Sequence, residues 1–291
     1  MAKPLTVLVT GATGQQGGAV ARELLERGHH VRAFTRKPTS AAAEKLKGRG
    51  AEVVQGDFED GASIERAARG ADAAFIMSTP FEAGMEAETR QGINAVDAAR
   101  RAGVKHIVYT SVASADQKTG IPHFDSKYRV EQHLAELAVP YTIVAPVFFM
   151  ENLLSPWWLP GLQAGSFAMA IPPERKLQQI AVENIGRFDA MVIELREPFL
   201  GQRIDIASDE LSGSDMARIL TQAAGRQIEY VQQPLEQVRS WSEDFATMYE
   251  WFDRVGYSAA IPKLRQEYPE VGWKGFRDWT KAQDWSVLRV A

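Results

Sequence analysis

The stretch "LVTGATGQQGGAVARELLERGHHVRAFTRKP", residues 8–38, indicates a strand, a glycine turn, a helix and a second strand, in that order. Residues 5–10 form an apolar, β-branched run that stops at Gly11. Apolar residues then recur with helical spacing until Gly28, and residues 30–35 have the pattern of a strand. We therefore expect the chain to begin with a β-α-β unit.

Three glycines occupy the turn of this unit, because Gly11, Gly14 and Gly17 follow the spacing G-x-x-G-x-x-G. The first permits a tight turn, the second lets backbone N–H groups approach a phosphate, and the third packs the helix close to the strand. The helix N-terminus then faces the pyrophosphate. A glycine triplet alone is weak evidence, but its place between a strand and a helix favours dinucleotide binding over a purely structural glycine turn.

The residues after the second strand predict which dinucleotide is bound. An acidic residue there would hydrogen-bond a free ribose 2′-OH, whereas an arginine accommodates a 2′-phosphate. The chain has Arg36 and Lys37 at this position. Because a guanidinium pairs bidentately with phosphate and stacks on adenine, we expect NADPH rather than NADH. The alternative is a solvated basic loop.

Composition excludes several classes of function. With 291 residues, of which 45% are hydrophobic and 24% charged, the chain has the composition of a soluble globular protein. The net charge of −4 gives no global basic field for nucleic acid, and the absence of cysteine excludes disulfides and thiolate chemistry. No signal-peptide layout and no apolar run of membrane-spanning length is found, so we expect a cytoplasmic protein without a membrane partner.

Strand and helix patterns alternate along the first half of the chain. After residue 36, helical segments near 41–47, 62–69, 86–102 and 126–137 alternate with apolar strands within 51–57, 72–78, 105–112 and 140–146. This alternation predicts an α/β fold, a doubly wound parallel sheet of the NAD(P)-binding Rossmann type. A ligand is expected at the carboxyl ends of the strands, where the sequence places Gly11, Arg36, Asp57, Ser78 and Ser111.

From Val147 onward the sequence becomes aromatic and rich in proline and glycine. We expect residues 1–150 to form the dinucleotide-binding domain and residues 151–291 a smaller C-terminal α/β substrate-binding part, partly packed back on the sheet. Within that part, 181–198 and 213–225 are predicted helices and 203–208 and 227–233 predicted strands. The tail, 235–285, is predicted to be mostly helical, with breaks at Gly256 and Pro262.

The segment "SVASADQKTGIPHFDSKYRVEQHL", residues 111–134, contains the residues that could carry chemistry. Short-chain dehydrogenases place a serine after the fifth strand and, about a dozen residues later, a Tyr-x-x-x-Lys pair. Here the spacing is kept, but His123 stands at the tyrosine position, with Lys127 four residues on. One helical turn separates the two side chains, so both can face the same ligand.

The chain resembles the NmrA-like branch of the atypical short-chain dehydrogenase/reductase superfamily. The resemblance is carried by "TGATGQQGGAV" (10–20), "GDFED" (56–60), "PHFDSKYRVEQHL" (122–134) and "APVFFMENL" (145–153). Members of that family include NADPH-dependent reductases of quinones, triphenylmethane dyes and phenolic ethers, and also regulators that bind the dinucleotide with little turnover. The resemblance implies that Lys127 reaches the nicotinamide ribose, that Asp57 and Phe58 lie near adenine, and that 147–152 lines nicotinamide and substrate. The missing tyrosine argues against ordinary alcohol dehydrogenation.

The predicted site therefore has three groups of residues. The candidate catalytic residues are Lys127, His123 and Ser111. The candidate cofactor-binding residues are Gly11, Thr13, Gly14, Gln15, Gly17, Arg36, Lys37, Asp57, Phe58, Ser78, Thr79, Lys127, Val147 and Phe148. The candidate substrate pocket comprises Phe149, Asn152, Trp157 and Trp158. The remaining histidines do not join acidic residues at metal-ligand spacing, so no metal is predicted.

Each candidate role has a structural alternative. Lys127 could anchor ribose hydroxyls, relay a proton, or be a solvated helix lysine. His123 could donate a proton near neutral pH or simply line the pocket, and Ser111 could bind cofactor or substrate or be a structural hydroxyl. The aromatic residues could form a flat pocket for aromatic or quinoid molecules, or pack in the core. They could also form a partner-binding patch.

These observations predict an NADPH-dependent oxidoreductase that transfers a hydride to a small aromatic or quinone-like acceptor. The alternative is an NADP(H)-binding redox sensor that acts through a protein partner with little turnover. A structural protein with a vestigial nucleotide site is a third interpretation. The sequence predicts no particular oligomeric state.

Overall fold

The computed structural model describes residues 3–288, and these fall into two compact units that interleave along the chain. Unit 1 comprises the chain up to Lys118, Pro122–Ala145 and Ile185–Ile204. Unit 2 comprises Thr119–Ile121, Pro146–Asn184 and the chain from Asp205 onward. The chain therefore leaves unit 1 after Ala145 and returns to it for twenty residues, 185–204, whereas the division into two domains at residue 150 stays a prediction.

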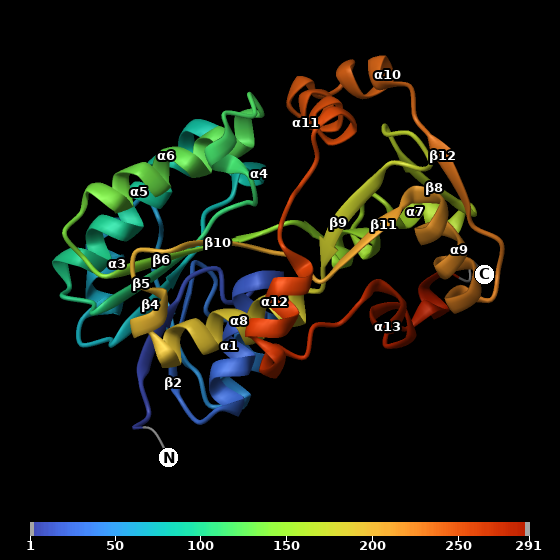
Figure 1. Ribbon diagram of the computed structural model, residues 1–291. Coiled ribbons are helices and arrows are strands. Elements are labelled where there is room, and N and C mark those ends of the chain that lie inside the picture. Colours follow the sequence, from blue (N-terminus) through green and yellow to red (C-terminus); the bar gives the residue numbers. More distant parts are fainter. Residues whose placement is uncertain (1–2, 289–291) are drawn as a thin grey trace. The chain divides into compact units, whose positions relative to one another are not determined.

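Unit 1 is built on a seven-stranded sheet with the strand order β10-β6-β5-β4-β1-β2-β3 (Figure 1). Strands β1 to β6 pair in parallel, which confirms the predicted doubly wound parallel sheet. The strand order runs outward in both directions from β1 and β4, so these two neighbours mark the topological switch point. The strands are β1 (Thr6–Val9), β2 (His30–Thr35), β3 (Glu52–Gln55), β4 (Ala73–Ile76), β5 (His106–Thr110), β6 (Tyr141–Pro146) and β10 (Arg203–Ile206).

Helices cover both faces of this sheet, with α3, α5 and α6 on one face and α1 and α8 on the other (Figure 1). Short polar side chains begin several of them, as where the Asp60 carboxylate accepts hydrogen bonds from the N–H groups of Ala62 and Ser63 at 3.0 and 3.1 Å. The helices are α1 (Gln15–Glu26), α2 (Ala41–Gly48), α3 (Gly61–Ala68), α4 (Pro80–Ala83), α5 (Met85–Arg101), α6 (Pro122–Glu136) and α8 (Val182–Leu195), of which the last enters unit 1 at Ile185.

The core of unit 1 lies between the sheet and helices α3, α5 and α6. Central strands that are covered on both faces must be apolar throughout, and β4 is buried at all four positions. Leu8 of β1 is fully buried in the same cluster, so its truncation to alanine is expected to cost about 2–5 kcal/mol.

Two helix starts in unit 1 differ from the sequence-based expectation. Helix α6 begins at Pro122 rather than near residue 126, so it contains His123 as well as Lys127. Proline suits the first position of a helix because its missing N–H would be unbonded there anyway. The same rule accounts for the unpredicted helix α4, where Thr79 is the N-cap and Pro80 the first residue.

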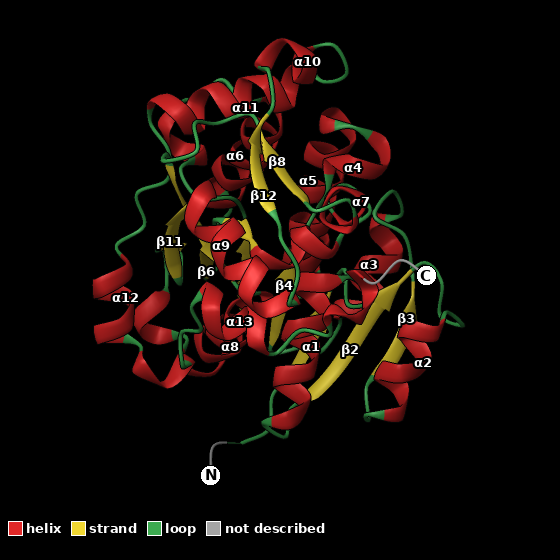
Figure 2. Cartoon of the chain, turned by 90° about the vertical axis from the view of Figure 1, so that its right-hand side faces the viewer, coloured by secondary structure: helices red, strands yellow, loops and turns green. Residues whose placement is uncertain are grey.

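Unit 2 contains two small sheets and a set of short helices. One sheet has the order β11-β9-β7, and the other pairs β12 with β8 in parallel (Figure 2). A serine caps the start of α9, because Ser212 Oγ accepts a hydrogen bond from the N–H of Asp215 at 3.2 Å. The elements are β7 (Phe148–Phe149), α7 (Leu159–Gln163), β8 (Ser166–Met169), β9 (Lys176–Ile180), β11 (Asp209–Ser212), α9 (Gly213–Ala224), β12 (Glu229–Gln232), α10 (Leu235–Arg239), α11 (Glu243–Arg254), α12 (Ile261–Glu267) and α13 (Phe276–Lys281), with 3₁₀ turns between some of them.

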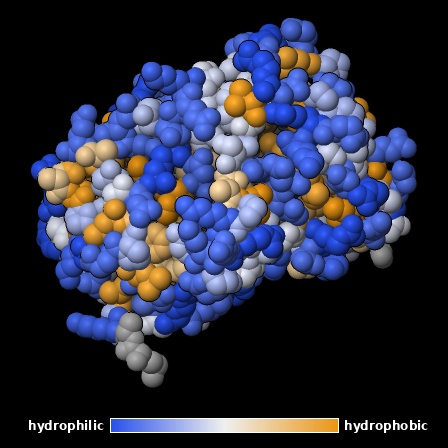
Figure 3. Space-filling view, in the orientation of Figure 1, coloured by the Kyte–Doolittle hydropathy of each residue, from blue (hydrophilic) through white to orange (hydrophobic). Residues whose placement is uncertain are grey.

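The face drawn in Figure 3 is mostly hydrophilic, with hydrophobic residues scattered over it rather than joined in one broad patch. Within residues 3–288, no helix combines the length and the apolar character needed to span a lipid bilayer.

Candidate functional site

The glycine loop after β1 is shaped so that side chains are excluded from it. Gly11 has φ +60°, and a Cβ atom there would lie 2.5 Å from the sulfur of Met77. A Cβ atom on Gly17 would lie 2.5 Å from the carbonyl oxygens of Thr10 and Gly11. Because the Gly17 contact is with backbone atoms, only glycine there lets the helix start this close to the strand, and the positive φ of Gly11 favours glycine in the turn.

Helix α1 begins at Gln15, and its N-cap is Gly14, which has no side chain to cap the helix. The first N–H groups of a helix have no partner within the helix and carry a partial positive charge. Thr13 is half-buried and Gln15 is exposed at this helix start. The loop therefore presents backbone amide donors, and their predicted contact with a diphosphate stays a prediction.

The adenosine side of the predicted site follows β2. Arg36 and Lys37 are both exposed, and the Arg36 guanidinium forms an ion pair with Glu82 of α4, with Nη2 and Oε2 2.5 Å apart. The two side chains are 54% and 56% exposed. Sequence reasoning missed Glu82. Its carboxylate lies beside Arg36, the cation predicted to bind the 2′-phosphate.

Asp57 and Phe58 lie after β3 and contribute to a turn and to the core. The Asp57 carboxylate accepts a hydrogen bond from the N–H of Glu59 at 2.9 Å. Phe58 packs edge-on against Phe34, with ring centroids 5.9 Å apart. Both contacts stabilise the loop on which these residues sit, and their predicted place near adenine stays a prediction.

Lys127 is held at the carboxyl end of β4 in unit 1. Its Nζ donates to the backbone carbonyl of Ser78 at 2.9 Å and lies 2.8 Å from Oε1 of Glu88 on α5. The Lys127 side chain is 14% exposed and that of Glu88 is 0% exposed. The Ser78 hydroxyl lies 3.4 Å from the Tyr109 hydroxyl, and Thr79 next to it caps α4. Lys127 is therefore not a solvated helix lysine.

Glu88 is the most prominent site residue that sequence reasoning missed. It lies on the buried stripe of α5 with Gly92, Ala95 and Ala99, so its position follows the helical repeat of the apolar face. An acidic residue on such a stripe is a signal that could have been found, because a buried carboxylate requires a partner.

His123 lies in the first turn of α6, half-buried, one helical turn before Lys127. Its ring packs edge-on against Phe124, with centroids 4.9 Å apart. The two predicted catalytic side chains thus share one helix, although their helix starts earlier than expected.

Ser111 is part of a buried polar network in unit 1. Its hydroxyl donates to Glu131 of α6, which in turn accepts from Nε of Arg203 at 2.9 Å. Arg203 also donates to the carbonyl of Val112 at 2.9 Å. Burial raises the pKa of Glu131, and the nearby Arg203 cation opposes that rise. In this arrangement the Ser111 proton points to Glu131, which gives the hydroxyl a structural role.

The apolar residues predicted for nicotinamide and substrate belong to unit 2. Val147 and Phe148 are buried, and Phe149 and Asn152 are half-buried. Phe148 packs edge-on against Trp158, with ring centroids 5.5 Å apart. Trp157 is 71% exposed and stacks instead near Trp241 and Phe245, with ring centroids 6.3 and 6.2 Å away. The structure therefore separates Trp157 from the Phe148–Trp158 pair.

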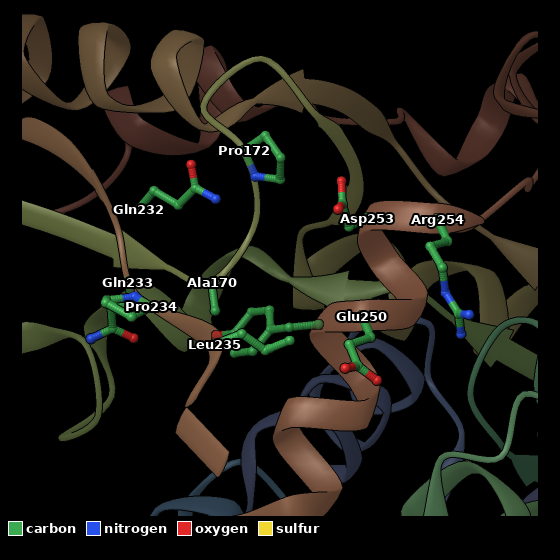
Figure 4. Close-up of a pocket in the computed structure, with 10 residues that line it drawn as sticks. Ala170, Pro172, Gln232, Gln233, Pro234, Leu235, Glu250, Asp253 and Arg254 are labelled. Atoms are coloured by element: carbon green, nitrogen blue, oxygen red, sulfur yellow. The ribbon is translucent and has the colours of Figure 1, made fainter. Parts of the chain in front are cut away.

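Unit 2 also contains an open recess of about 470 Å³ (Figure 4). None of the predicted site residues lines it. Its walls come from the ends of β8 and β12 and from α10 and α11, namely Ala170, Pro172, Gln232, Gln233, Pro234, Leu235, Tyr249, Glu250, Asp253 and Arg254.

Residues 3–288 include no group of three histidine, cysteine or acidic side chains placed to hold a metal ion.

Comparison with known proteins assigns the family. The model of the NmrA-like family matches residues 3–285. Among curated relatives, the NAD(P)H azoreductase of Xenophilus azovorans is 30% identical over 80% of this chain and 79% of its own length.

Solved structures share the fold over nearly the whole chain. NmrA, a negative transcriptional regulator, in complex with NADP superposes with a TM-score of 0.80 at 22% identity, covering 98% of this chain and 99% of that one. The NADPH-dependent quinone oxidoreductase of Escherichia coli, in complex with NADPH, superposes with a TM-score of 0.77 at 24% identity, covering 95% and 98%.

Proposed function

Because the chain belongs to the NmrA-like family, we propose that it is an NADPH-dependent reductase that transfers a hydride to a small aromatic or quinone-like acceptor. The observation that carries this proposal is the set of donors along one edge of the unit 1 sheet. The glycine loop follows β1, Arg36 follows β2, and Ser78 with Lys127 lies at the end of β4. Parallel strands end at the same edge, so these groups flank the switch point between β1 and β4.

The residues present fit such a dinucleotide. Glycines keep the loop after β1 free of Cβ atoms, so that a ligand can approach the backbone. The uncapped amides of α1 suit the pyrophosphate. Arg36 is exposed at the end of β2 and suits a 2′-phosphate. The Lys127 ammonium suits the hydroxyls of the nicotinamide ribose at the end of β4.

The reduced nicotinamide supplies the hydride when NADPH is bound. This chain's own residues then hold the two ends of the dinucleotide and provide a proton. His123 is the candidate donor, because it lies one helical turn before Lys127 and a protonated imidazole can act as a general acid. Water, or a path through Lys127, is the alternative source. Ser111, whose proton points to Glu131, is the least suited of the three predicted catalytic residues.

The acceptor class rests on the relatives. The Xenophilus relative is named an azoreductase and the Escherichia coli structure a quinone oxidoreductase, and both names describe flat, electron-poor acceptors. Aromatic side chains in the segment after β6 suit molecules of this shape.

The test mixes purified protein with NADPH and a panel of quinones, azo dyes and activated alkenes, and follows the absorbance of the reduced nicotinamide. We expect turnover with at least one acceptor and a large loss of turnover in Lys127→Met. Absence of turnover with every acceptor would contradict the reductase proposal. If the protein then bound NADP⁺ and NADPH with strongly different affinities, the redox-sensor alternative would replace it.

A further inference from the structure

We infer that Glu88 is a positioning residue, whose buried carboxylate fixes the Lys127 ammonium in the orientation that receives the nicotinamide ribose. This inference rests on the proposed function and extends it to a residue outside the predicted site.

The carboxylate of Glu88 contacts two side chains of α6. Oε2 accepts a hydrogen bond from the Ser126 hydroxyl, and Oε1 lies 2.8 Å from Nζ of Lys127 in an ion pair that has no hydrogen-bond geometry. Both partners are consecutive residues of α6, whereas Glu88 is on α5. The Ser126 contact therefore holds the carboxylate charge beside the Lys127 ammonium.

The two helices approach closely at this point because α5 carries a glycine. Gly92 lies one turn after Glu88, and a Cβ atom there would be 2.6 Å from Cγ2 of Val130, which lies one turn after Ser126. This close approach brings the α5 backbone near to α6 one turn from Glu88. The glycine and the glutamate therefore act together to bring a carboxylate to Lys127.

The arrangement leaves the ammonium with donors for a ligand. An ammonium has three N–H donors and no acceptor. The Ser78 carbonyl accepts one of them, and the Glu88 carboxylate holds the ammonium by its charge, at 2.8 Å and without a hydrogen bond. A remaining N–H is available to an acceptor such as a ribose hydroxyl.

A purely structural role for the pair does not explain its cost. Removing a carboxylate from water is expensive, even when it is paired. The same two helices are already joined at the surface by the Glu86–Arg129 ion pair, with Oε1 and Nη1 3.0 Å apart and both side chains more than half exposed. The exposed pair already joins α5 to α6 without the desolvation penalty of a buried carboxylate. We therefore explain the buried pair by its effect on Lys127.

The test measures NADPH binding by titration calorimetry on the full chain for Glu88→Gln, Glu88→Asp, Lys127→Met and the double variant Glu88→Gln/Lys127→Met. Glu86→Gln is the matched control, since it removes a carboxylate from the same helix at its exposed pair. Thermal unfolding of each variant confirms that it is folded at the temperature of the titration.

We expect Glu88→Gln to weaken NADPH binding about tenfold, Glu88→Asp about threefold and Glu86→Gln less than twofold. The double variant is expected to bind as Lys127→Met does, because Glu88 acts only through Lys127. If Glu88 had a purely structural role, adding Glu88→Gln to Lys127→Met would weaken NADPH binding further. If Glu88→Gln does not fold, Glu88→Asp carries the test, because it keeps the charge and withdraws the oxygen from Lys127.

The outcomes separate this inference from the proposed function. Wild-type protein that binds no NADPH would overturn both. Wild-type protein that binds NADPH, with Glu88 variants within twofold of it or with additive losses in the double variant, would overturn only the role of Glu88. The order wild type, Glu88→Asp, Glu88→Gln in affinity, with no further loss in the double variant, would support it.

Discussion

Two cations at the same edge of the unit 1 sheet, Lys127 and Arg36, meet their carboxylate partners in opposite environments. The Lys127–Glu88 pair is enclosed, with a glutamate side chain that is 0% exposed. The Arg36–Glu82 pair is open, with both side chains more than half exposed. Breaking a buried pair leaves an uncompensated charge, whereas an exposed pair contributes little.

The difference separates two ways of preparing a binding site. Lys127 is positioned by the fold, so its geometry is complete before any ligand arrives. Arg36 is free to exchange one anionic partner for another, so a 2′-phosphate can replace the Glu82 carboxylate. On the proposed function, the first arrangement positions a binding group in advance and the second selects the ligand.

The largest expected effect comes from removing the buried cation. Lys127→Met leaves the Glu88 carboxylate buried without a counter-charge, and we expect a loss of about 3–5 kcal/mol in the free energy of unfolding. Urea denaturation at pH 7 measures it. Adding Glu88→Gln should recover part of the loss, because the uncompensated charge is then gone. A double variant no more stable than Lys127→Met would show that the charge was not the cause.

A buried histidine should make stability depend on pH. Burial, helped by the positive charge of Arg196, lowers the pKa of His106 to about 4. The unfolded chain binds this proton near pH 6.5, so the contribution is fully present above that pH and is lost as the pH falls toward about 4. Over this window we expect the wild type to lose about 3 kcal/mol more than His106→Gln. Urea midpoints between pH 7.5 and pH 4 measure it.

The matched control for this prediction is His30→Gln, because His30 is exposed at the start of β2. It should keep the pH dependence of the wild type. If His106→Gln lost stability along the same pH curve as the wild type, burial of His106 would not be its source.

Removing the exposed cation should change ligand choice more than stability. We expect Arg36→Ala to weaken NADPH binding by about 1.5–3 kcal/mol, the contribution typical of hydrogen bonds to charged groups, and to affect NADH far less. Titrations with both dinucleotides measure it, and Arg49→Ala, on the exposed Glu26 pair, is the control. Equal losses for the two dinucleotides would refute the role of Arg36.

The smallest expected effect belongs to the partner of Arg36. Glu82→Gln should change the free energy of unfolding by less than about 1 kcal/mol, because the pair is exposed. It should strengthen NADPH binding, since Glu82 no longer competes for the guanidinium, and leave NADH binding unchanged. Weaker NADPH binding in this variant would mean that Glu82 assists the site rather than competing within it.

The sheet of unit 1 could be predicted because the buried strands have a recognisable apolar sequence pattern. Strands covered on both faces, such as β4, are continuous apolar runs, and the glycine spacing after β1 marks its turn. Strand β12 of unit 2 falls within the predicted strand 227–233, but the other short strands of this unit are not continuous apolar runs of this kind. Strand β9 contains Gln178 and Gln179, both buried. The Gln178 amide exchanges hydrogen bonds with the backbone of Ala259, at 3.0 and 2.9 Å, which no local pattern reveals.

The candidate site divides in the same way. The glycines, Arg36 and Lys127 follow a spacing that the sequence displays, so they could be proposed from it. Glu88 and Glu82 act on those residues from helices that are distant in the sequence, and their partners appear only when the chain is folded. The exposure of the Trp157 side chain also could not be predicted, because a tryptophan in an aromatic segment is compatible with either a pocket or the surface.

Strand β10 imposes an order of events on synthesis. It lies beside β6 at the edge of the sheet, yet it is synthesised only after Pro146–Asn184, a segment of unit 2, has emerged. Until then, β6 has an unpaired edge and the Glu131 carboxylate lacks Arg203. A nascent chain that stops near residue 150 therefore exposes a strand edge that can pair with other chains and aggregate. Chaperone binding or rapid elongation would limit this aggregation until Ile204 has been added.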